Sequence, residues 1–173
     1  MIDAPGRQIP RFPPALEPRV AGAITANLDE VSVGAEDVAI SSAACGSDIL
    51  FAEAALARGT PLRIYLPFDE PEFLERSVAF ANSRWPERHR AVVARSQLFI
   101  APRELGPLPP GGDPFERTNR WMLNEAQALC GGNIMFICVW NGEEGDGPGG
   151  TRHMMDRVRD AGGAAHWIDI RKL

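Results

Sequence analysis

The sequence predicts an α/β protein with a Rossmann-like, three-layer fold, in which helices cover both faces of a mostly parallel sheet of about five strands. Short apolar stretches alternate with helical stretches from residue 38 onward, as in repeated strand–helix units. The most apolar stretch, residues 134–140, contains no polar side chain, which is typical of a strand buried on both faces. With 173 residues, 45% of them hydrophobic, the chain can form one domain, residues 1–173, around a buried core.

The first half of the chain divides clearly at its prolines and glycines. Prolines recur through residues 1–14 and predict a Pro-rich N-terminal arm without regular structure. Residues 15–33 place an apolar residue at every fourth position, which predicts a helix. Residues 38–44 follow as a strand, and Ser47 and Asp48 can cap the next helix, which Gly59 ends.

The second half continues the alternation. A Pro/Gly-rich loop or lid is predicted at residues 103–114, which hold four prolines and three glycines. A second glycine-rich stretch, residues 141–150, contains five glycines. The predicted strands are 62–68, 97–101, 133–140 and 164–170, and the predicted helices are 49–58, 70–81, 86–95, 115–130 and 151–161.

Composition excludes several classes of function. The chain has 18 basic and 23 acidic residues, and a net charge of −5 argues against a nucleic-acid partner. Its longest apolar run is seven residues, whereas a membrane helix needs ~20. The three cysteines lack CxxC spacing, so we expect neither a metal site nor a disulfide framework, and no cofactor. The polar first residues do not resemble a signal peptide, so we expect a cytoplasmic protein.

The first candidate site is a strand, a glycine-rich loop and a helix in succession. A helix N-terminus at a strand's carboxyl end attracts anions, and glycines let a phosphate reach the backbone. The predicted cradle consists of Gly147, Gly149, Gly150 and Thr151, with Arg152 beside it to neutralise charge. The stretch matches neither Walker A nor GxGxxG, and it can equally be an ordinary turn capped by Thr151.

The second candidate site is the small-residue stretch that enters the helix after the first predicted strand. Ser42, Gly46 and Asp48 are the candidate base and ribose contacts, although Asp48 can simply be an N-cap. Within that helix, Glu53 is a candidate nucleophile or sugar ligand if it faces the pocket, and part of the polar face otherwise. His89, in a charged helix, is expected to be exposed.

Four motifs, in order, resemble the SLOG superfamily, and in particular the SLOG-like domains attached to bacterial signalling proteins such as cyclases and tetratricopeptide-repeat or TRAFs-binding proteins. The motifs are residues 3–7 with 10–13, residues 46–55, residues 121–123 and residues 145–151. The resemblance covers nearly the whole chain. It implies a Rossmann-like fold that binds nucleotides or nucleotide-derived ligands, either as a sensor or as an enzyme that cleaves N-glycosidic bonds.

The sequence departs from that family in two ways. Related domains begin with a strand ending in Gly-His ahead of the position of Met1, so the resemblance implies that this strand and its ligand-facing turn are missing upstream of Met1. The phosphoribohydrolases carry PGGxGTxxE with a catalytic glutamate, whereas counting from Thr151 places Met154 at that position. The resemblance therefore extends to the phosphate cradle and not to the catalytic acid.

The leading expectation is a module that binds or senses a nucleotide-like small molecule, with Arg7 as a further phosphate contact and signalling proteins as partners. We also expect a homo-oligomer. One alternative is a nucleoside or nucleotide N-glycosidase similar to the 2′-deoxyribosyltransferases or phosphoribohydrolases, with Glu53 as nucleophile in the first case. Another alternative is a protein-interaction module with a vestigial pocket.

Overall fold

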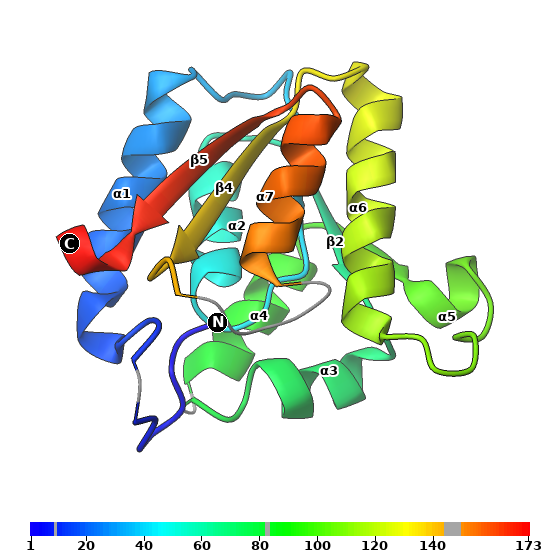
Figure 1. Cartoon of the computed structure of the whole chain (residues 1–173), viewed down its shortest axis with the longest axis horizontal. Coiled ribbons are helices and arrows are strands. Elements are labelled where there is room, and N and C mark those ends of the chain that lie inside the picture. The colour runs from blue at the N-terminus through cyan, green and yellow to red at the C-terminus, as the bar shows by residue number, and fades with distance from the viewer. Residues whose placement is uncertain (9, 82–83, 144–149) are drawn as a thin grey trace.

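The structure is a computed structural model that describes residues 1–8, 10–81, 84–143 and 150–173 (Figure 1). Its strands are β1 Ala39–Ser41, β2 Leu62–Leu66, β3 Gln97–Ile100, β4 Met135–Trp140 and β5 Ala164–Asp169. Its α-helices are α1 Glu17–Glu30, α2 Ser47–Ala57, α3 Glu70–Ser77, α4 Arg84–Val93, α5 Ala101–Glu104, α6 Pro114–Cys130 and α7 Thr151–Asp160. Two short 3-10 turns, η1 Pro14–Leu16 and η2 Ile170–Lys172, complete the list.

The α/β class with parallel strands is confirmed, but the single sheet of about five strands is not observed. The strands form one sheet of order β1-β2-β3 and a second sheet of order β4-β5, both parallel. In the described part of the chain no strand of the first sheet pairs with a strand of the second. Apolar periodicity locates strands along a chain but carries no information about which strands pair, so the division into two sheets could not be predicted.

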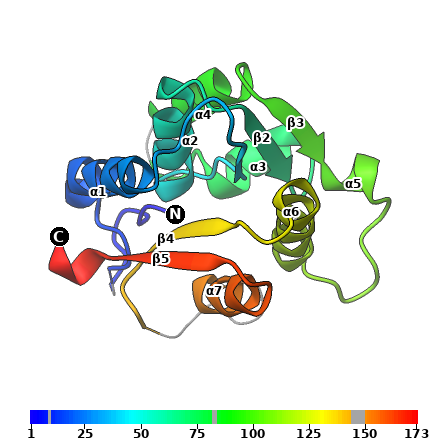
Figure 2. The same ribbon diagram turned by 90° about the horizontal axis from the view of Figure 1, so that it is seen from above.

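Helices cover both faces of the sheets. Figure 2 shows α1 and α2 on one side of β4 and β5, and α7 on the other. The buried stripe of α1, Val20, Ile24 and Leu28, belongs to the same core cluster as Ile64 of β2 and Ile168 of β5. Both sheets therefore share one core. A smaller cluster joins α6 to α7 through Leu123, Met154 and Val158.

The N-terminal arm is packed against the fold by polar and apolar contacts. The carboxylate of Asp3 accepts hydrogen bonds from the backbone N–H groups of Arg11 and Phe12, at 2.9 Å for each shorter contact. Ile2 and Phe12 are buried in the core, and the Ile2 N–H donates to the carbonyl oxygen of Cys45 at 3.0 Å. The arm consequently lies against the turn that follows β1.

Two local expectations need correction. The predicted loop 103–114 begins inside the short helix α5 and ends in the first residue of α6, where Asp113 caps the helix by accepting the Glu116 N–H at 2.6 Å. His89 was expected to be exposed, but it is fully buried. Its helix is charged on one face only, and the other face packs against α2. In the described residues no helix is both long and apolar enough to cross a membrane.

Candidate functional site

A cavity of about 250 Å³ lies between the two sheets, and we call it the inter-sheet cavity. Strands β1 and β4 line it, together with residues of helices from both layers. The strand residues are Ile40, Ser41, Met135, Phe136, Ile137 and Val139. The helix residues within its apolar part are Ile24, Phe51, Met122 and Met154.

The carboxyl end of the inter-sheet cavity is polar. Ser42 reaches it from the turn after β1, Ser47 and Asp48 from the start of α2, and Thr151 from the start of α7. The two candidate segments identified in the sequence therefore line one cavity, at the strand ends where open α/β sheets bind ligands. Met154, at the position where the resemblance would place a catalytic glutamate, also lines the cavity.

A buried histidine holds the turn after β1. Ala43 has a positive φ of 55°, and its carbonyl oxygen lies 2.9 Å from Nδ1 of His89. Because a carbonyl can only accept, the proton of this hydrogen bond is on Nδ1. Burial lowers the pKa of His89, so the ring stays neutral at physiological pH. Sequence reasoning missed this positioning role, since nothing local links residue 89 to residue 43.

Of the described residues that line the cavity, Asp48 is the one with a carboxylate side chain. Within the described ranges it accepts two long hydrogen bonds, from the Ala44 N–H and the Ser47 hydroxyl, both at 3.4 Å. Burial raises the pKa of Asp48 above its ordinary 3.8. A weakly satisfied carboxylate of this kind is suited to accept a hydrogen bond from a ligand hydroxyl or amine.

Gly46 has a structural reason to be glycine that differs from the predicted ligand contact. Its φ is +99°, and a Cβ at this position would lie 2.5 Å from the backbone nitrogen of Ile2. The N-terminal arm crosses directly over it. Gly46 is not among the residues that line the inter-sheet cavity.

The start of α7 is described from Gly150 onward, so Gly147 and Gly149 of the predicted cradle lie outside the described residues. Gly150 is the N-cap of α7, in extended conformation. The guanidinium carbon of Arg152 lies 5.3 Å from the centroid of the Trp140 ring, a cation–π contact that places a positive charge beside the end of β4.

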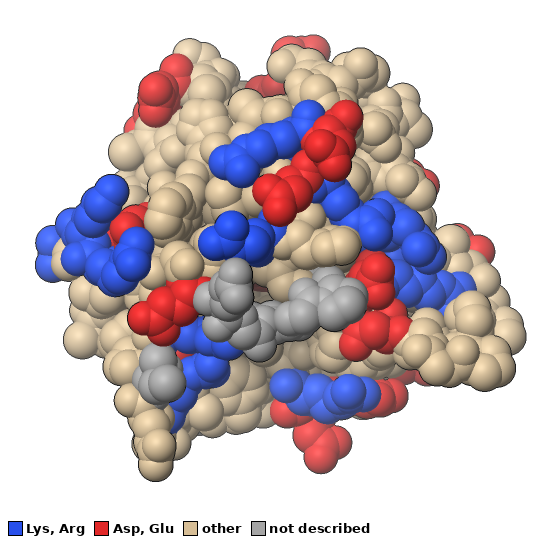
Figure 3. Space-filling view, viewed as in Figure 1, with Lys and Arg blue, Asp and Glu red and all other residues tan. Residues whose placement is uncertain are grey.

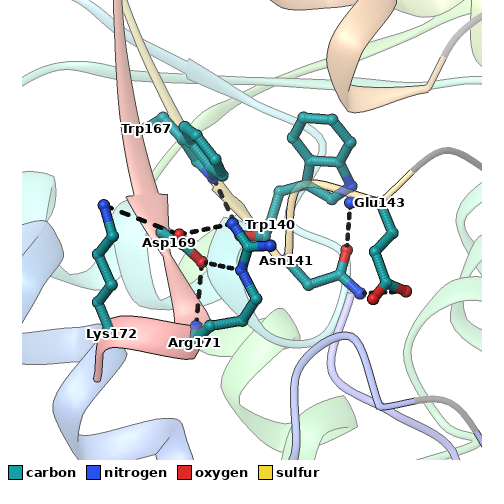
Figure 4. A network of polar contacts seen from close by, with 7 residues as sticks. All are labelled: Trp140, Asn141, Glu143, Trp167, Asp169, Arg171 and Lys172. Carbon is teal, nitrogen blue, oxygen red and sulfur yellow. Dashed lines mark hydrogen bonds and ion pairs between the residues drawn. The ribbon is translucent and has the colours of Figure 1, made fainter.

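A polar network surrounds the carboxyl ends of β4 and β5 (Figure 4). Asp169 accepts two hydrogen bonds from the Arg171 guanidinium, at 2.8 Å each, and this pairing lowers the pKa of Asp169 to about 2. Asn141 accepts the Glu143 N–H at 3.1 Å and continues the network. On the face seen in Figure 3, basic side chains lie beside acidic ones among the residues described.

Glu53 and Arg7, like Gly46, Gly150 and Arg152, are predicted site residues that do not line the inter-sheet cavity. Glu53 accepts two hydrogen bonds from Arg88, at 2.8 and 2.6 Å, and Arg88 also binds Glu17. Arg7 pairs with Asp3 at 3.6 Å, within the N-terminal arm. Both residues thus have structural partners away from the place where Ser42, Asp48 and Thr151 meet.

Helix α6 contributes residues that sequence reasoning did not assign to a site. Asn119 and Met122 line the inter-sheet cavity, and the Ser42 hydroxyl lies 3.7 Å from the sulfur of Met122. The spacing of Asn119 and Met122 on an amphipathic helix predicts that their side chains are buried, and it gives no sign that they contact a ligand. The described residues contain no group of three or more His, Cys, Asp or Glu that could hold a metal.

The three thiols are expected to differ sharply in reactivity. Burial raises the pKa of Cys45 to about 11 and that of Cys138 to about 12, whereas Cys130 is exposed. Because the thiolate is the reactive form, we expect a maleimide to label one thiol per folded chain at pH 7. Intact mass after labelling should show one adduct, and none in Cys130→Ser. Rapid labelling of Cys45 in the folded protein would contradict its burial.

The fold and the site therefore define an α/β protein with parallel strands and a cavity whose polar end lies at the strands' carboxyl ends. Comparison of the chain with protein-family models, curated proteins and solved structures finds no match. The functional argument consequently rests on the site itself.

Proposed function

We propose that the protein binds a nucleotide or nucleotide-derived signalling ligand at the carboxyl end of the inter-sheet cavity. One observation carries the proposal: Ser42, Asp48 and Thr151 come from segments far apart in the sequence and line the same cavity. Two chemically different groups of contacts, one suited to a phosphate and the other to a sugar or base, are thereby brought within reach of one small molecule.

The phosphate would bind at the start of α7. The first N–H groups of a helix have no intrahelical acceptors and lie at the positive end of its dipole. Gly150 has no side chain to obstruct the approach of an anion, and Thr151 adds a hydroxyl donor. Arg152, held over Trp140, would supply a compensating positive charge.

The sugar or base would contact the turn after β1 and the start of α2. Asp48 can accept a hydrogen bond from a ribose hydroxyl, and Ser42 and Ser47 can donate or accept. The apolar part of the cavity, with Phe51 and Met122 among its lining residues, offers a surface for a base.

The site favours binding over cleavage of an N-glycosidic bond. Glu53, the nucleophile of the enzymatic alternative, is held by Arg88 and does not line the cavity. Met154 stands where the phosphoribohydrolases have their acid. We therefore expect no release of free adenine from AMP at an enzymatic rate, above ~1 per second.

Binding can be tested by thermal unfolding with AMP, ADP and inorganic phosphate. We expect AMP to stabilise the protein and Thr151→Val to weaken AMP affinity roughly tenfold, because a hydrogen bond to a charged group contributes ~1.5 kcal/mol or more. Thr25→Val makes the same chemical change on an exposed position of α1 and should leave affinity unchanged. Glu53→Gln should also retain binding.

Two outcomes would contradict the proposal. One is that none of these nucleotides stabilises the protein, which would favour an interaction module with a vestigial pocket. The other is that Thr151→Val binds AMP as tightly as Thr25→Val, which would place the phosphate elsewhere.

A further inference from the structure

Strand β3 forms the outer edge of the three-stranded sheet. In the described part of the chain it pairs with β2 alone, and Figure 2 shows it at the end of the sheet that lies away from β1. One side of its backbone is therefore open to a further strand.

The hydrogen-bond register identifies the backbone groups on this open side. The Ala39 N–H donates to the Pro61 carbonyl, so alternate residues of the β2 chain, counted from Pro61, face β1. Ile64 falls between these residues and faces β3 instead. Because Ile64 is opposite Leu98 in the parallel register, Leu98 directs its own N–H and C=O away from β2. One donor and one acceptor of Leu98 thus face outward.

The side chains of β3 do not protect this edge. Unpaired edges are templates for association, and proteins commonly blunt them with charged side chains or proline. The four residues of β3, Gln-Leu-Phe-Ile, include neither, and Leu98 is 36% exposed. The outer strand of the other sheet differs, because β5 ends in a charged network formed by Asp169, Arg171 and Lys172. Strand β3 is thus the less protected of the two outer strands.

The edge of β3 is self-complementary. When two copies lie antiparallel about a two-fold axis at Leu98, the Leu98 N–H of each copy faces the Leu98 C=O of the other. Both outward groups are then satisfied, and the two exposed leucine side chains lie directly opposite each other across the axis. A two-fold interface of this kind uses the same surface of both copies and needs no other partner.

The charges on either side of β3 fit the same arrangement. Arg95 precedes the strand, Glu104 ends the helix α5 that follows it, and both residues are exposed. Antiparallel pairing sets the amino end of one β3 beside the carboxyl end of the other, which brings Arg95 of each copy toward Glu104 of its partner. Opposite charges therefore meet at both ends of the paired strands.

The segment after β3 supplies apolar surface beyond the strand itself. A pair of four-residue strands is smaller than a stable interface, which typically buries ~1,200 Å² or more. Helix α5 and the loop that follows it project beside this edge, and Leu105 and Leu108 are exposed there (Figure 1). Both leucines can add to the contact between two copies.

We propose that the protein forms a two-fold homodimer in which β3 pairs antiparallel with β3 of a second copy. The two three-stranded sheets become one six-stranded sheet of order β1-β2-β3-β3-β2-β1, centred on the two Leu98 residues. The inter-sheet cavity is lined by β1, two strands away from the interface, so each copy keeps its own cavity. The dimer is independent of any nucleotide.

Sedimentation equilibrium over a dilution series tests the dimer. We expect a mass that approaches twice that of the single chain as concentration rises. Leu98→Lys places two like charges at the axis and should raise the dimer dissociation constant roughly a hundredfold or more. Val31→Lys is the matched control, because Val31 is a similarly exposed apolar residue at the end of α1, on the opposite side of the molecule from β3 (Figure 2). It should leave the dissociation constant unchanged.

Leu98→Pro tests the backbone pairing separately from the side chain. The Leu98 N–H faces outward, so proline removes the donor of the proposed pair without removing a bond to β2. Leu98→Pro should weaken the dimer as Leu98→Lys does. In the parent protein, amide exchange at Leu98 should slow roughly tenfold or more between the dilute and the concentrated sample. The Ile64 amide, already within the sheet, is the internal control.

Three outcomes would overturn the proposal. One is a single-chain mass at every concentration, and another is a dimer that Leu98→Lys leaves intact. The third is a dimeric parent protein in which exchange at Leu98 does not depend on concentration, which would place the interface elsewhere even if the variants failed to fold. Because no nucleotide is present in these measurements, failure here is distinct from failure of the binding proposal.

Discussion

Replacing Gly46 by alanine is expected to destabilise the protein by about 3 kcal/mol or more. Two costs add at this position. The backbone has a φ of +99°, which a side chain disfavours, and the new Cβ would lie 2.5 Å from the backbone nitrogen of Ile2. The neighbour is main chain and cannot rotate away, so the N-terminal arm must be displaced together with the buried Ile2.

Gly59→Ala separates the two costs. Gly59 ends α2 with a φ of +73°, and no atom lies within 4 Å of a Cβ built there. Alanine at residue 59 should therefore cost only ~1 kcal/mol, from backbone conformation alone. Denaturant unfolding of both variants measures the difference. Equal costs would mean that the arm does not cross Gly46 as the structure shows.

Asp48→Asn is expected to stabilise the unliganded protein near neutral pH while weakening ligand binding. Burial raises the pKa of Asp48, which means that the fold disfavours the ionised carboxylate. Asparagine keeps the shape and removes the charge. A gain on the order of 1 kcal/mol would raise the Tm by ~2–4 °C in a chain of this size.

The pH dependence of this gain follows from the direction of the pKa shift. The folded pKa of Asp48 lies above the unfolded value of 3.8, so the stability linked to this group is complete below 3.8 and is lost as pH rises through the folded pKa. The advantage of Asp48→Asn should therefore be present at pH 7 and disappear below about 3.8. Thermal unfolding across this range measures it.

Asp69→Asn is the matched control. Asp69 is the N-cap of α3 and Asp48 lies in the first turn of α2, so both are near a helix start, but the Asp69 side chain is 61% exposed and pairs with Arg103 on the surface. Such pairs contribute little, so this variant should change neither stability nor AMP affinity measurably. Under the proposed function, Asp48→Asn should reduce AMP affinity roughly tenfold through loss of a charged acceptor. If Asp48→Asn were less stable than the parent at pH 7, Asp48 would be serving the fold rather than a ligand.

Local features of the sequence determined the elements of this protein. Each of the five predicted strands overlaps an observed one, because short apolar runs bounded by Gly, Pro and polar residues are signals carried by neighbouring positions. The predicted start of α7 at Thr151 is confirmed, whereas α2 begins at Ser47, two residues before the predicted helix 49–58, and its N-cap is Gly46 instead of Ser47 or Asp48. Both candidate segments were therefore placed correctly at the ends of strands.

Contacts between distant residues decided the rest. The pairing of Glu53 with Arg88, the burial of His89 beneath Ala43 and the passage of Ile2 over Gly46 each join segments that are separate in sequence. The division into two sheets also depends on such contacts, because the apolar patterns of β1 and β4 would be the same if both strands belonged to one sheet. Periodicity records which side chains are buried, whereas strand order and side-chain partners depend on the whole chain packing together, and only the tertiary structure supplies them.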